Sequence, residues 1–141
     1  MNLNDVKRDV ATAEQGAWIG KKYGISIPGM GDLCFKVRSS QNSDWRKLEA
    51  KLIAAVPMQQ RIAGLPPEAR DAITGQCLLE AGVLDWDGLD DGSTPILYSR
   101  EQAKLMFVDE PAFSDIRDAA LWCANLVGTA TAAALETDSK N

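Results

Sequence analysis

Histidine is missing from this 141-residue chain, and with it the commonest general base of enzymes. The sequence also has no GxSxG motif, no P-loop and no GxGxxG motif. A catalytic cysteine would need a neighbouring base to form its thiolate. We therefore predict that the chain is not an enzyme and that it needs no cofactor. A small enzyme stays an alternative that a deep pocket with converging polar groups would support.

Cysteine is scarce, and its spacing fits neither a disulfide framework nor a metal site. The chain has Cys34, Cys77 and Cys123, an odd number with no CxxC spacing, and each lies among apolar residues. This pattern predicts buried, reduced thiols.

Long apolar runs and an excess of basic residues are absent too. No stretch of about 18 apolar residues exists, which argues against a membrane span. The net charge of -5 argues against nucleic acid as a partner, because binding phosphates needs a basic surface. Residues 1–8 are polar and lack the apolar core of a secretory signal, so we expect none.

Four acidic residues within a glycine-containing segment raise the question of calcium binding. An EF-hand loop needs oxygen ligands at alternate positions, a glycine at position six and a glutamate at position twelve. Counting from Asp87 puts Leu89 at position three and Tyr98 at position twelve, and counting from Asp85 fails as well. We predict no metal site, and a turn in which aspartate side chains accept hydrogen bonds from nearby amides. The acidic residues are Asp85, Asp87, Asp90 and Asp91.

The N-terminal third has the period of β-strands. Short β-branched stretches occupy residues 17–20 and 25–27, and Leu33, Phe35 and Val37 alternate with less apolar neighbours. Residues 28–32 have the glycines and the proline of a turn. These features predict a small antiparallel sheet of two or three strands within residues 17–38.

The remainder has helical periodicity with clear boundary signals. Asn42 or Ser43 can cap a helix whose apolar stripe begins at Trp45 and ends before Pro57. Pro67 is placed to open a second helix, which Gly82 is expected to terminate. Further helices are expected after the capping-box residues Ser99 and Gln102 and from Pro111, the last with an apolar face that includes Ala120, Cys123 and Val127.

Together these features predict a mainly α fold, a helical domain with a small N-terminal antiparallel β-sheet. We expect residues 1–15 to form an arm or a short helix. Residues 16–135 are expected to form a single α-rich domain with a β-hairpin at 17–38, and residues 136–141 a disordered tail.

Four tryptophans are many for a chain of this length: Trp18, Trp45, Trp86 and Trp122. Most are expected to anchor the core, where sheet and helices meet. One can instead lie at a contact with another chain, where tryptophan is enriched. Our candidates for partner contacts are Trp122, Leu126 and Leu135 on the last helix, together with Trp18.

Three blocks in a fixed order support a family resemblance. The first is the strand region from Gly16 to Val37 followed by the helix that starts at Asn42. The second is the segment Leu84-Asp85-Trp86-Asp87-Gly88-Leu89. The third is the segment 91–99 followed by the helix start at 109–115. Over roughly residues 16–127 the chain resembles the tail assembly chaperones of long-tailed bacteriophages and related prophages.

The resemblance implies a non-enzymatic, largely helical protein of the host bacterial cytoplasm. Such a protein would bind and solubilise the tape-measure protein, recruit tail-tube subunits and form homo-oligomers, without nucleic acid or membrane as a partner. An alternative from the same viruses is a minor structural tail protein or head–tail connector protein of the virion.

Overall fold

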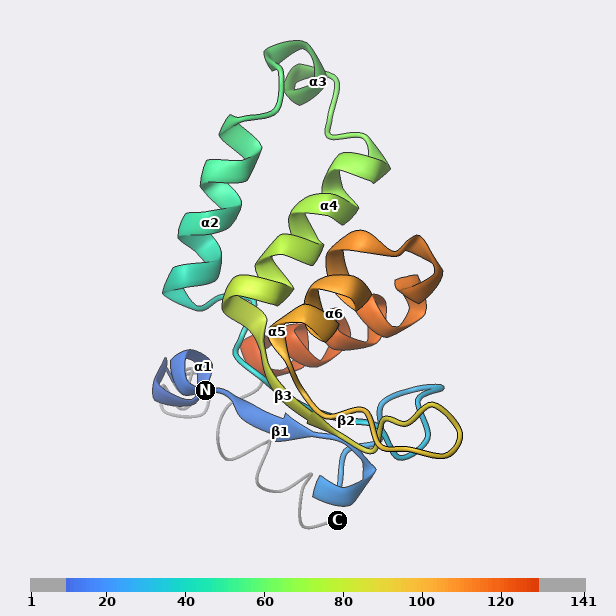
Figure 1. Cartoon of the computed structure of the whole chain (residues 1–141). Helices are drawn as coiled ribbons and strands as arrows, with labels where there is room; N and C mark the ends of the chain where they lie inside the picture. Colours follow the sequence, from blue (N-terminus) through green and yellow to red (C-terminus); the bar gives the residue numbers. More distant parts are fainter. Residues whose placement is uncertain (1–9, 130–141) are drawn as a thin grey trace.

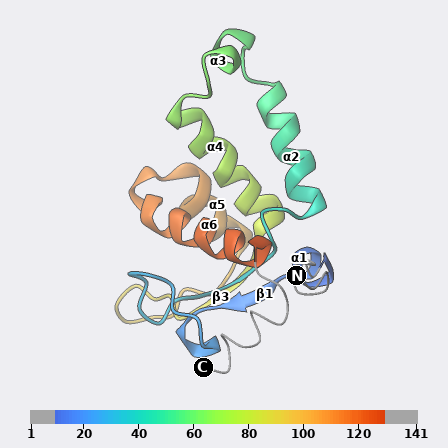
Figure 2. The ribbon, with the colours of Figure 1, turned by 180° about the vertical axis from the view of Figure 1, so that it is seen from behind.

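The structure is a computed structural model, and it describes residues 10–129. A three-stranded sheet lies at one end of the molecule, α5 and α6 pack above it, and α2, α3 and α4 extend away to the other end (Figures 1 and 2). Among the sequence predictions, Leu135 and the tail 136–141 lie outside the described residues. So does most of the N-terminal arm, of which the structure shows helix α1 at Val10–Gln15.

The sheet is antiparallel with the order β1-β2-β3. Strand β1 is Ala17–Ile19, β2 is Cys34–Val37 and β3 is Val83–Asp87. The third strand therefore comes from the middle of the chain, and the segment 25–27 contributes only an isolated bridge between Gly20 and Ile25. The prediction of a mainly α fold with an N-terminal sheet is wrong. The fold is mixed α/β, and its sheet joins distant parts of the sequence.

Strand β3 follows a helix without a loop. Helix α4 (Pro67–Cys77) passes into a π-helical turn, η3 (Leu78–Gly82), which leads directly into β3. The helical segment ends at Gly82 as predicted, but Gly82 does not have the positive φ of a C′ glycine. Its role is steric, because a Cβ atom there would lie 2.7 Å from the ring of Trp45.

Helices α2 (Ser43–Ala54), α3 (Met58–Ile62) and the first part of α4 form a projecting lobe. The predicted cap of α2 is confirmed, since Asn42 Oδ1 accepts a 2.8 Å hydrogen bond from the Trp45 amide. Asn42 is fully buried and also donates to the carbonyl oxygens of Ser39 and Ala81, each at 2.7 Å. This one side chain thus joins the base of α2 to the turn before β3.

An ion pair and a second capping interaction connect α1 to the start of α2. The Glu14 carboxylate accepts from the Ser43 amide at 2.9 Å and from the guanidinium of Arg38 at 3.1 Å. The hydrogen bond from the Ser43 amide is the main cause of the lowered pKa of Glu14. Arg38 also contacts Asp44, at 2.9 Å.

The second half of the chain supplies most of the layer above the sheet. Helix α5 (Arg100–Lys104) is capped by Ser99, whose hydroxyl accepts from the Gln102 amide, which is one half of the predicted capping box. A π-helical turn, η4 (Leu105–Asp109), and a 3-10 turn, η5 (Pro111–Phe113), then lead to α6 (Ser114–Thr129). The core lies between this layer and the sheet, where Phe35 packs against Phe107 with ring centroids 6.3 Å apart.

Candidate functional site

The outer face of the sheet carries an open groove, which we call the aromatic groove. Trp18 of β1 and Asp85 of β3 both pair with Lys36 of β2, so their side chains share the face that points away from the core. The groove has a volume of about 530 Å³. It is lined by Trp18, Tyr23, Leu84, Asp85, Trp86, Asp87, Leu97 and Tyr98.

Two aromatic pairs support the aromatic groove, although Trp86 is only 5% exposed and pairs with Phe35 on the core face of the sheet. Trp18 stacks on Tyr23 with ring centroids 5.2 Å apart, and Trp86 meets Tyr98 edge-on at 4.9 Å. The Trp86 indole N–H donates to the carbonyl oxygen of Ile96 at 2.8 Å, which fixes the segment before Tyr98 against β3. The aromatic groove is therefore held in place by contacts within the chain.

Two leucines at the aromatic groove are exposed to solvent, although leucine side chains are usually buried. Leu97 is 79% exposed and Leu84 is 39% exposed. Beside them Lys22 Nζ donates a 3.2 Å hydrogen bond to Asp87 Oδ2 in a surface ion pair, and this contact raises the pKa of Lys22. An exposed apolar surface with a charged rim is suited to binding another polypeptide.

A second groove, which we call the Trp122 groove, lies between α6 and the segment that precedes β2. Its volume is about 300 Å³, and an apolar floor is bordered by two exposed carboxylates, Asp115 and Asp118. Trp122 is 38% exposed here. The lining residues are Ile27, Pro28, Met30, Asp115, Asp118, Ala119 and Trp122.

The acidic segment forms the turn that its sequence predicts. Asp91 Oδ1 accepts from the amides of Ser93 and Thr94, at 3.1 and 2.8 Å, and these hydrogen bonds lower the pKa of Asp91. Asp90 accepts from the Gly92 amide in the same way. Within residues 10–129, no group of three or more histidine, cysteine, aspartate or glutamate side chains is arranged to hold a metal ion.

The three thiols are free and buried, as predicted. Burial raises the pKa of both Cys77 and Cys123 to about 12, so almost no thiolate forms at these sites near neutral pH. We expect a disulfide reagent such as DTNB at pH 8 to label the native protein at least about a hundredfold more slowly than the unfolded chain, which should release three equivalents. Rapid labelling of the native protein would mean that the core opens readily.

The four residues predicted to contact partners lie in different places. Trp18 lines the aromatic groove and Trp122 lines the second groove, so the structure does not bring them together. Leu126 is half-buried against the core, and Leu135 lies outside the described residues. Leu97 and Tyr98 were not predicted to contact partners, because a short apolar run such as residues 96–98 in a loop shows no periodicity that tells buried from exposed residues.

A family model described as YdaY prophage protein matches residues 40–141. The chain belongs to this family. It is therefore a protein of phage or prophage origin. No curated protein and no solved structure matches it.

The match to the YdaY family begins after β2, so it includes α2 to α6 and β3 but not the first two strands. Leu84 and Leu97 of the aromatic groove fall within the matched residues, whereas Trp18 and Tyr23 precede them. None of the helices in residues 10–129 is long and apolar enough to cross a membrane.

Proposed function

We propose that this phage-derived protein is a tail assembly chaperone, which binds and solubilises the tape-measure protein and promotes assembly of the tail tube without catalysis. The observation that carries the proposal is the aromatic groove, with Leu97 exposed at a preformed aromatic wall. A groove of this kind can receive the apolar face of a partner helix. The resemblance to tail assembly chaperones supplies the identity of the partners, the tape-measure and tail-tube proteins.

A non-catalytic role in the host cytoplasm agrees with the chemistry of the chain. Histidine is absent, and the thiols of Cys77 and Cys123 are held protonated by burial. The overall negative charge suits a protein that keeps an aggregation-prone partner in solution.

Co-expression with the tape-measure protein of the same phage or prophage tests this proposal. The wild-type chain should increase the soluble fraction of the tape-measure protein, measured after centrifugation. Leu97→Asp should weaken direct binding by about 10- to 100-fold, because burying one leucine contributes about 1.5–3 kcal/mol. Since Leu97 is already 79% exposed, the substitution should leave the fold intact.

Ile62→Asp is the matched control for Leu97→Asp, since Ile62 is 80% exposed but lies at the far end of the molecule on α3. Binding of the tape-measure protein should survive this change. An unchanged soluble fraction with the wild-type chain, or equal binding by Leu97→Asp, would contradict the proposal. Stoichiometric amounts of the protein in purified virions would instead identify it as a structural tail or connector protein.

A further inference from the structure

The tip of the projecting lobe exposes two large apolar side chains together. Met58 is 66% exposed and Ile62 is 80% exposed. They are four residues apart on α3, so they lie on the same face of that helix, and the exposed Arg61 is beside them. We call residues 43–66, which contain α2 and α3, the arm.

The arm is basic on an acidic molecule. It contains four basic and two acidic residues, a net charge of +2. Since the whole chain has a net charge of -5, the rest of the chain has a net charge of -7. None of the arm's basic residues forms an ion pair within residues 10–129. These basic residues are Arg46, Lys47, Lys51 and Arg61.

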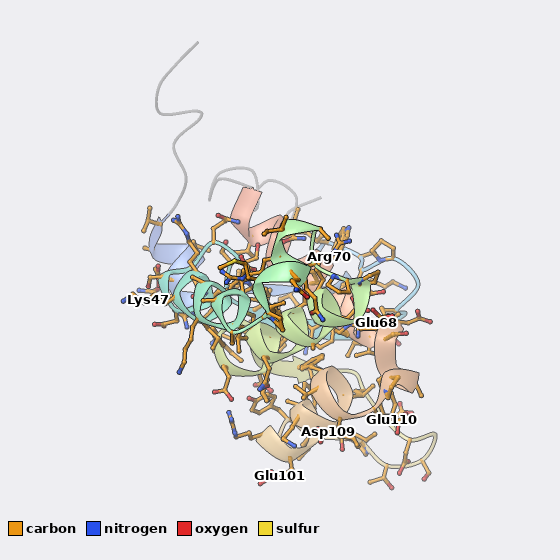
Figure 3. All side chains as sticks on the ribbon, turned by 90° about the horizontal axis from the view of Figure 1, so that it is seen from above. Lys47, Glu68, Arg70, Glu101, Asp109 and Glu110 are labelled. Carbon is orange, nitrogen blue, oxygen red and sulfur yellow. The ribbon has the colours of Figure 1, made fainter. Side chains whose placement is uncertain are left out.

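Acidic residues are concentrated in residues 85–118, of which Asp115 and Asp118 line the Trp122 groove. Residues 85–118 contain nine acidic and three basic residues, a net charge of -6. Seen from the end of the arm, Glu101, Asp109 and Glu110 gather on one side of the molecule, whereas Lys47 points away on the other (Figure 3). Lys47 of the arm is thus placed away from these three acidic side chains.

The Trp122 groove complements the arm tip in both polarity and charge. Its floor is apolar, and its exposed carboxylates belong to Asp115 and Asp118. Asp115 has no ion-pair partner within residues 10–129, and Asp118 has only Arg117, at 3.5 Å. A volume of about 300 Å³ is at the lower limit of ligand pockets, so it suits a few side chains better than a large cofactor.

We infer that the arm tip of one copy docks into the Trp122 groove of a second copy, with Met58 and Ile62 on the apolar floor and Arg61 near the carboxylates. The same molecule cannot satisfy both surfaces. Its helix α3 lies at the end of the molecule opposite the sheet (Figures 1 and 2), whereas the lining of the Trp122 groove comes from α6 and residues 27–30. Because two different surfaces meet, the contact is head-to-tail and leads to rings or open chains. This inference concerns surfaces separate from the aromatic groove.

Two variants with exposed substitutions test the contact by sedimentation. The arm variant carries Met58→Asp and Ile62→Asp, and the groove variant carries Asp115→Lys and Asp118→Lys. The wild-type protein should form assemblies whose mass rises with concentration and falls with added salt, since salt screens the charges. Each variant alone should be monomeric, with association weakened at least about tenfold.

An equimolar mixture of the two variants gives the decisive measurement. The intact arm of the groove variant should enter the intact groove of the arm variant, so the mixture should form a dimer and nothing larger. Leu97→Asp is the control and should assemble like the wild type. Circular dichroism should confirm that every variant is folded.

Three results would overturn the head-to-tail contact: a wild-type protein that remains monomeric at several hundred micromolar, variants that associate like the wild type, or a mixture that stays monomeric. None of these results bears on tape-measure binding. Loss of tape-measure binding in Leu97→Asp with normal self-association would in turn leave this inference unaffected.

Discussion

Replacing Gly75 with alanine is expected to lower the free energy of unfolding by about 3 kcal/mol, although alanine is the better helix former. A Cβ atom at this position of α4 would collide with the carbonyl oxygen of Phe107 and lie 3.1 Å from the carbonyl carbon. Overpacking a core costs about 1–3 kcal/mol, and here the obstacle is backbone rather than a side chain that can rotate. The helix-propensity gain of about 1 kcal/mol is too small to offset it.

Urea unfolding followed by circular dichroism measures this effect. Ala72→Gly is the matched control, because Ala72 is exposed on the same helix and its change reports helix propensity alone. It should destabilise by about 1 kcal/mol. A Gly75→Ala variant as stable as the wild type would mean that α4 and the η4 turn can separate at little cost.

Replacing Asn42 with alanine is expected to destabilise the protein by about 2–3 kcal/mol. The change removes the cap of α2, which is worth about 1 kcal/mol. It also removes the donor to the Ala81 carbonyl oxygen, and an unsatisfied buried polar group costs about 1–3 kcal/mol. The effect should be measured as a lower midpoint of urea unfolding with an unchanged slope.

Two further substitutions separate the contributions of Asn42. Asn42→Asp keeps the acceptor for the Trp45 amide but places a buried carboxylate oxygen against the Ser39 and Ala81 carbonyl oxygens, so at neutral pH it should destabilise at least as much as Asn42→Ala. Asn125→Ala removes the exposed acceptor of the 2.7 Å hydrogen bond from the Ser40 hydroxyl and should cost less than about 1 kcal/mol. If Asn42→Ala and Asn125→Ala lowered the free energy of unfolding equally, the burial of Asn42 would not explain its contribution to stability.

Local features of the fold could be predicted from the sequence. The cap at Asn42 and the hydroxyl acceptor at Ser99 depend on residues three positions away, and both were found where the sequence indicates. The strand that contains Phe35 was also predictable, because its period is visible within a few residues.

Strand β3 was missed because its pairing depends on a distant part of the chain. Leu84 and Trp86 alternate with Asp85 and Asp87, which is a strand signal, but a register shift beside Val37 places Leu84 outside the core. The strand signal can be interpreted only when it is known that β2 pairs with β1 on one edge and needs another strand on its other edge. The steric roles of Gly75 and Gly82 could not be predicted either, since both depend on which helix packs against which.

The candidate surfaces were predictable only in part. Trp18 and Trp122 were chosen for their residue type, and each lines a groove, but the sequence did not distinguish them from the buried Trp45 and Trp86. Ile62 and Leu97 were not chosen, because neither the single Ile62 nor the short run around Leu97 carries a sign of its exposure.

The direct passage from α4 into β3 has a mechanical consequence. Val83 follows Gly82 without an intervening loop, so one uninterrupted segment runs from the lobe that carries α3 to the wall of the aromatic groove. Because no loop separates the helical segment from the strand, we expect a tilt of α4 to displace the start of β3. The two ends of the molecule are therefore not independent modules joined by a flexible linker.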